Sequence, residues 1–261
     1  MPHIDVSKSH LADRGDDRPT VIDGVSPSVH PDVVSHLAGE FVIGENDAGN
    51  VLHPAYTAAH SAMSNLWAMS STLAEAEAAI KANGRDPASE RRLRASAEGS
   101  LSKARKAAEG ALDAIAQHRE QTEAAITEAL GVNEARQQVT AALRASAIHG
   151  HLARIADPAK RGTELQDILS ESDAESAAAI LAAPARASGL TAKEHAAFRK
   201  AAELKFAGKT VALRDSLDRL RTVLDRAAKL TEERFGPLVG IGGSHAARTE
   251  AALRALEGGA N

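Results

Sequence analysis

The chain has 261 residues, with 31 Lys and Arg against 35 Asp and Glu, which gives a formal net charge of −4 at pH 7. It contains no Cys, and this excludes disulfides, Cys-ligated zinc, iron–sulfur clusters and thiol nucleophiles. Alanine supplies 56 residues, whereas Leu, Ile, Val and Phe together supply only 52. Because Ala, Leu, Glu, Lys and Arg favour helices, the composition predicts a mainly α-helical protein with thin, Ala-rich seams between its helices.

Residues 1–53 are predicted to form an extended arm, because prolines are frequent there and alanines are rare. Inside the arm, residues 41–52 predict a small β-hairpin: two short apolar runs flank residues 44–49, whose Asn, Asp and Gly suit a turn. An isolated hairpin is marginally stable in water, so we expect its strands to lie on the helical body or on another subunit; the alternative is an unstructured tail. The candidate arm contacts are Phe41, Val42, Ile43, Val51 and Leu52.

Residues 54–235 are predicted to form a bundle of long helices. The first helix starts at Pro54 and stops at Asn83-Gly84, the second covers residues 88–130, and the third runs from Asn133 to Ala156. Three capping boxes then mark the starts of two short helices and of a last long helix over residues 192–234. The boxes pair Thr163 with Gln166, Ser172 with Glu175 and Thr191 with Glu194.

The two long helices at 88–130 and 192–234 carry large apolar residues at helical spacing. In the helix at 192–234 these residues recur in steps of four and three, as in coiled coils. In the helix at 88–130, two pairs of them have a spacing of eleven residues. Because the alanines between them bury little area, we expect neighbouring copies or partner proteins to complete the seams. The candidate interface residues are Leu101, Leu112, Ile115, Ile126, Phe206, Leu213, Leu217, Leu220 and Leu224.

Residues 236–261 are predicted to form a Gly-rich loop and a short C-terminal helix. The loop lacks the Lys-Ser/Thr pair of a P-loop. The histidines do not have metal-ligand spacing, since His149 and His151 face different sides of a helix and His53 and His60 have no matching acidic residue. We therefore predict no catalytic, cofactor-binding or metal-ligating residues and no cofactor, and we expect that the protein is not an enzyme.

The segment 85–106 has the strongest local concentration of positive charge. Its Lys and Arg residues suit non-specific contacts with phosphates, and no aromatic side chain is present to stack on bases. The segment could equally contact an acidic partner, and the alternative to both is a solvated helix face. The candidate phosphate contacts are Arg91, Arg92, Arg94, Lys103, Arg105 and Lys106.

The run from Ser172 to Arg199 contains a short helix, Pro184, a loop that ends at Gly189 and the capped start of the next helix. It resembles helix–Pro–loop–helix segments in Ala-rich helical proteins associated with the virions of tailed bacteriophages and with related gene-transfer particles. The resemblance is confined to this run and carries no catalytic positions. It implies a role in a virion or in its assembly.

These observations favour a non-enzymatic structural or assembly protein, for which we expect a place in the head, neck or tail of a tailed-phage virion assembled in the host cytoplasm. Its helical seams and N-terminal arm would bind further copies or other virion proteins, and its basic segment would contact packaged DNA non-specifically. We expect no membrane partner, because no apolar run approaches the length that spans a bilayer. The alternatives are a cytoplasmic helical adaptor or regulatory protein, and a non-specific nucleic-acid-binding helical module.

Overall fold

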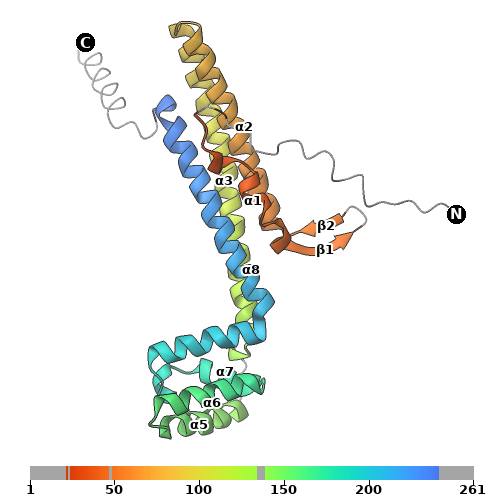
Figure 1. Cartoon of the computed structure of the whole chain (residues 1–261), viewed down its shortest axis with the longest axis vertical. Helices are drawn as coiled ribbons and strands as arrows, with labels where there is room; N and C mark the ends of the chain where they lie inside the picture. Colours follow the sequence, from red (N-terminus) through yellow and green to blue (C-terminus); the bar gives the residue numbers. More distant parts are fainter. Residues whose placement is uncertain (1–21, 23, 47–48, 134–138, 241–261) are drawn as a thin grey trace, which may run out of the picture. The chain divides into compact units, whose positions relative to one another are not determined.

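The structure, a computed structural model, describes residues 22, 24–46, 49–133 and 139–240. This part of the chain is mainly α-helical with a two-stranded antiparallel hairpin, so the predicted fold class is confirmed (Figure 1). The chain divides into two compact units. The first unit comprises Met1–His36, His60–Gly110 and Val223–Asn261, and the second unit comprises Leu37–Ala59 and Ala111–Thr222. Both units therefore take residues from the predicted arm and from the predicted bundle.

Long helices supply residues to both units. They are α2 (Pro54–Ala82), α3 (Pro87–Ala129) and α8 (Ala192–Phe235), and each lies within a residue or two of its predicted range. α2 begins where Pro54 needs no amide hydrogen, and the N–H of Ala55 donates to Nδ1 of His53 at 3.2 Å. α2 ends at Ala82; Gly84 follows with a φ of 89°, which favours glycine, and the N–H of Arg85 donates to the carbonyl of Ile80.

In the first unit, segments of α2, α3 and α8 lie side by side with two short N-terminal turns, η1 (Pro27–Val29) and α1 (Asp32–Ser35) (Figure 1). Arg234 on α8 connects this helix to α2 and to the segment before η1, because its guanidinium donates to Glu77 at 2.5 Å and to the carbonyl of Gly24 at 3.0 Å. The larger buried side chains of this unit are Val25, Val29, Val34, Met63, Leu66, Leu73, Leu101, Leu224 and Phe235. Part of the predicted arm, residues 24–36, thus packs as folded turns instead of extending freely.

The predicted hairpin is confirmed and belongs to the second unit. Here η2 (Ala38–Phe41) leads into β1 (Val42–Asn46), which pairs antiparallel with β2 (Gly49–Leu52). Phe41 lies buried at the base of the hairpin, where its ring stacks on that of Tyr56 at 5.4 Å. Its carbonyl accepts a 2.8 Å hydrogen bond from the N–H of His53. These contacts attach the base of the hairpin to the start of α2.

Shorter helices enclose the apolar core of the second unit. They are α5 (Val139–Arg154), α6 (Pro158–Ser170), α7 (Ala174–Ala182) and the turn η3 (Ala185–Ser188). Residues 134–138 of the predicted third helix lie outside the described residues. The core combines buried side chains of α3 and α8 with those of the shorter helices: Ile126, Leu130, Leu152, Leu165, Ile180, Leu181, Leu190, Phe198 and Val211. α7 is buried over six consecutive residues, which its alanines make possible because small side chains let neighbouring helices approach.

The capping box at the start of α8 is confirmed. The N–H of Glu194 donates to Oγ1 of Thr191 at 3.2 Å, and the N–H of Thr191 donates to Oε2 of Glu194 at 2.7 Å. Backbone donors that would otherwise lack partners are satisfied at this end, so the first turn of the helix is well defined.

The other two predicted capping boxes, Thr163 with Gln166 and Ser172 with Glu175, are wrong. α6 begins before Thr163, because Asp157 accepts a 2.9 Å bond from the N–H of Ala159 and Pro158 occupies the first helical position. α7 is capped by Asp173, whose carboxylate accepts from the N–H of Ser176 at 3.0 Å. In both cases an aspartate supplies the cap in place of the predicted hydroxyl.

α8 is bent at Ala207, whose φ of −133° and ψ of 27° are not helical. Gly208 follows directly, and a glycine inside a helix is unfavourable because its backbone is more flexible than that of other residues. The apolar period predicted for this helix is therefore interrupted just after Phe206. At the other end α8 leads into η4 (Gly236–Val239), while residues 241–261, with the predicted C-terminal helix, lie outside the described residues.

Candidate functional site

The predicted helical interface residues lie mostly inside the chain. Leu217, Leu220, Leu224, Ile115 and Ile126 are fully buried and Leu101 is nearly so. Leu112, Leu213 and Phe206 are half-buried. The atoms that cover these side chains belong to the same chain, so they fill seams within one molecule, and their use between separate chains stays a prediction.

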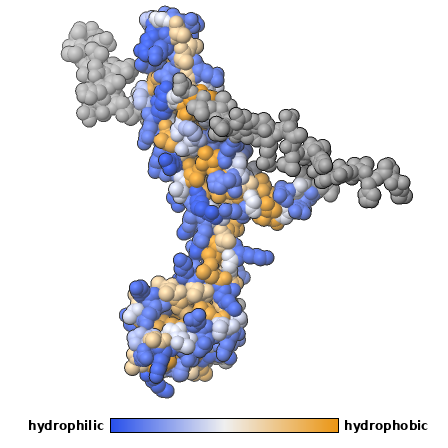
Figure 2. Space-filling model, in the orientation of Figure 1, coloured by the Kyte–Doolittle hydropathy of each residue, from blue (hydrophilic) through white to orange (hydrophobic). Residues whose placement is uncertain are grey.

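The hairpin carries two of the four large apolar residues that are exposed in the described part of the chain; the other two, Leu143 and Leu204, lie on α5 and α8. Every residue of β1 is exposed, with Val42 at 38% and Ile43 at 57% exposure, while Val51 and Leu52 of β2 are half-buried. The register shifts between Val42 and Gly44, so Ile43 forms a bulge, a feature that redirects a side chain. Figure 2 shows hydrophobic and hydrophilic surface next to each other on this projection. Of the predicted arm contacts, only Phe41 is fully buried.

The predicted phosphate contacts do not share one environment. All six are exposed, but Arg105 is committed to acidic partners, at 2.8 Å from Glu109 and 3.7 Å from Glu232. Its hydrogen bond with Glu109 and the charge of Glu232 raise the pKa of Arg105. Arg94 lines a cavity together with cationic side chains that are not among the predicted phosphate contacts. The remaining four predicted contacts make no ion pair within the described part of the chain: Arg91, Arg92, Lys103 and Lys106.

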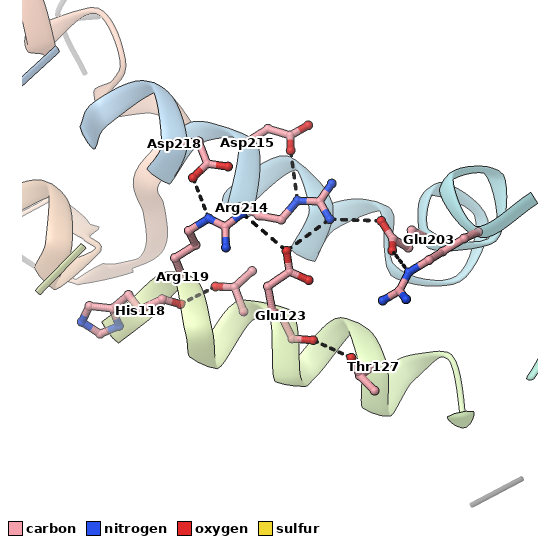
Figure 3. Close-up of polar contacts among 10 residues, drawn as sticks. His118, Arg119, Glu123, Thr127, Glu203, Arg214, Asp215 and Asp218 are labelled. Carbon is pink, nitrogen blue, oxygen red and sulfur yellow. Dashed lines mark hydrogen bonds and ion pairs between the residues drawn. The ribbon is translucent and has the colours of Figure 1, made fainter. Parts of the chain in front are cut away.

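A network of charged residues joins α3 and α8 within the second unit (Figure 3). Arg119 donates to Asp218 at 2.7 Å, and Arg214 donates to Glu203 at 3.0 Å. Glu203 is only 7% exposed and also accepts from Arg199 at 2.9 Å. Burial acts to raise the pKa of Glu203, but the hydrogen bonds and charges of Arg199 and Arg214 outweigh burial and hold this pKa below its usual value. No pattern in the sequence predicted this network.

Two histidine rings meet where α2 begins. The rings of His53 and His118 are 4.6 Å apart in an edge-on arrangement. Nδ1 of His53 accepts the capping bond from Ala55, so it must be unprotonated for the cap to form. Burial lowers the pKa of His53, and charge on His118 lowers it further.

We expect the protein to lose stability below neutral pH because of His53. A lowered pKa in the folded state means that protonation favours unfolding, so the free energy of unfolding falls as the pH drops from 6.5 through the lowered value. We expect a loss below about 1 kcal/mol, because solvent screens a partly exposed ring. Urea denaturation at pH 7.5 and 5.0 measures it. His53→Asn keeps a capping side chain that does not titrate, so a pH dependence equal to that of the wild type would contradict this assignment.

A serine–histidine contact also lies in the second unit, between η3 and α5. Oγ of Ser188 is 2.6 Å from Nδ1 of His149, and burial is the main cause that lowers the pKa of this histidine. Ser188 has no exposed surface, so a substrate carbonyl cannot reach its hydroxyl. The pair therefore serves to connect η3 to α5.

Among the described residues, no three His, Asp or Glu side chains are grouped as metal ligands would be. None of the described helices combines the length and hydropathy of a membrane span. Comparison of the chain with models of protein families, with curated proteins and with solved structures gives no match.

Proposed function

We propose that the protein is a non-enzymatic structural or assembly subunit that attaches to further protein subunits through its β1–β2 hairpin. The observation that carries the proposal is the hairpin itself, whose base is fixed by Phe41 while all of β1 stays exposed. A two-stranded hairpin is marginally stable in water, and one that keeps apolar residues on its surface gains stability when a partner covers it.

The chemistry of the hairpin indicates the kind of partner. Its two strands pair with each other and with no third strand in the described residues, so backbone groups along the outer edges are available for strand addition. The bulged Ile43 adds an apolar side chain that a shallow pocket on a partner could hold. A protein surface offers both a strand edge and such a pocket. The resemblance of residues 172–199 to virion-associated proteins makes a tailed-phage particle the setting that we propose.

Incorporation into particles tests the proposal. Particles are purified from cells in which the gene is wild type, encodes Ile43→Asp, or encodes Leu143→Asp, and the protein is quantified in them by mass spectrometry. Leu143 is a matched control, because it is 70% exposed on α5 and receives the same charge. We expect the wild type and Leu143→Asp in the particles. Incorporation of Ile43→Asp should fall about tenfold or more, as expected when a buried apolar contact worth about 1.4 kcal/mol is lost.

Two results would contradict the proposal. Absence of the wild-type protein from purified particles excludes the virion setting. Equal incorporation of Ile43→Asp and Leu143→Asp excludes the hairpin as the point of attachment. Circular dichroism of the purified variants checks that both remain folded.

A further inference from the structure

The first unit, which does not include the hairpin, contains a cavity of about 530 Å³ where α2 ends, α3 begins and α8 passes into η4. Ligand sites for small molecules commonly have volumes of about 300–1,000 Å³, so the space is sufficient for one small organic molecule. Its walls carry both apolar and charged residues. The apolar part includes Ile80, Leu93 and Leu238, all of which are half-buried.

The charged part of the wall has an excess of cations. Arg234 is neutralised by Glu77, to which it donates at 2.5 Å. Lys81, Arg85 and Arg94 make no hydrogen bond or ion pair to another side chain within the residues that the structure describes, and Glu90 is the remaining acid of the wall. Three free cations and one free carboxylate give this wall a net positive charge, which favours the binding of an anion.

The backbone holds Arg85 in an uncommon conformation at this wall. Its φ of 51° lies in the left-handed region, which is unfavourable for a non-glycine residue. The N–H of Arg85 donates to the carbonyl of Ile80, and this bond closes the end of α2. The turn therefore fixes the position at which the arginine leaves the backbone, whereas Arg94 approaches from the first turns of α3.

We infer that this cavity binds a small organic phosphate ester, with the phosphate between Arg85, Arg94 and Lys81 and the organic part against the apolar wall. A phosphate monoester carries a charge of about −1.5 to −2 near pH 7, which matches the excess of cations. Guanidinium groups bind phosphate through paired N–H donors. Two arginines and a lysine therefore suit a ligand with a phosphate group better than a ligand with a single carboxylate. The apolar residues explain why an ester fits the cavity better than inorganic phosphate.

Calorimetric titration with phenyl phosphate tests the site, since this probe combines one phosphate with one small apolar ring. We expect saturable binding of phenyl phosphate, weaker binding of inorganic phosphate, and no heat of binding with phenol. Arg94→Ala should weaken binding at least about tenfold, because a charge-assisted hydrogen bond contributes roughly 1.5–3 kcal/mol. Arg85→Asn should do the same while keeping the left-handed backbone, which asparagine tolerates.

Arg92→Ala is the matched control, because Arg92 is an exposed arginine on the same helix and does not line the cavity. It should leave the affinity for phenyl phosphate unchanged. If phenyl phosphate does not bind, or binds equally to Arg94→Ala and Arg92→Ala, the inference is wrong, and Lys81 and Arg234 serve only to stabilise the C-terminal ends of α2 and α8, in whose last turns they lie. Binding of a 20-base-pair DNA duplex that Arg92→Ala and Arg94→Ala weaken equally would instead assign these residues to an open nucleic-acid surface.

Discussion

Replacing Leu152 with alanine is expected to lower the free energy of unfolding by about 3 kcal/mol, because the change leaves a cavity in a closely packed core. Leu152 lies on α5 with no exposed surface and belongs to the core of the second unit, together with Ile126, Ile180 and Phe198. Urea denaturation followed by circular dichroism measures the loss.

Leu143→Ala provides the control for this prediction. The same side chain is removed from the same helix, but Leu143 is 70% exposed and packs against little. Its free energy of unfolding should stay within about 0.5 kcal/mol of the wild type. If the two variants differed by less than about 1 kcal/mol, α5 would not contribute to the core as the structure shows.

Replacing Glu203 with alanine is expected to cost about 2–3 kcal/mol. Loss of one member of a buried ion pair leaves the partner's charge unbalanced and costs about 3–5 kcal/mol in fully buried cases. The expected loss is smaller here, because Arg214 keeps Asp215 at 3.2 Å and Glu123 at 3.6 Å. Denaturation in urea at pH 7 measures the effect.

The pH dependence and a surface pair provide the controls for Glu203. Its pKa is lowered in the folded state, so its contribution is present above the ordinary carboxylate pKa of about 4.3 and is lost as the pH falls through the lowered value. The wild type and Glu203→Ala should therefore become similar in acid. Asp225→Ala removes an exposed pair with Lys229 on the same helix and should cost less than about 0.5 kcal/mol. A loss in Glu203→Ala no larger than in Asp225→Ala would contradict the role of the network.

The ends of the long helices could be predicted because single residues determine them. Proline is favoured at the first position of a helix and glycine just after its last turn, and both are unfavourable in the interior. Pro54 and Gly84 therefore mark the two ends of α2. The caps of α6 and α7 were harder to predict, since a Ser or Thr three residues before Glu or Gln also occurs inside helices. Aspartate caps helices as well as serine or threonine does. Asp157 lies before Thr163 and Asp173 lies next to Ser172, so the pattern alone could not decide which residue is the cap.

The charged network and the cavity could not be predicted, because both depend on residues that are distant in the chain. Glu203 and Arg214 are eleven residues apart on opposite sides of the bend at Ala207, and the apolar period gave no sign of a bend. The many Lys and Arg residues of segment 85–106 predicted a positively charged surface. However, Lys81 of the cavity lies outside this segment, and Arg92 of the segment does not line the cavity. A concentration of charged residues along the sequence does not show which of their side chains lie close together in the folded chain.

The edge-on contact between His30 and the only tryptophan, Trp67, gives the protein an internal optical reporter. The rings are 4.6 Å apart and both residues belong to the first unit, whereas the only tyrosine, Tyr56, lies in the second unit. Emission from the indole thus follows the release of the η1–α1 turns from α2, and emission from the phenol follows the base of the hairpin. The wild-type chain therefore carries one intrinsic fluorophore in each unit, so unfolding can be followed near each of them without any label.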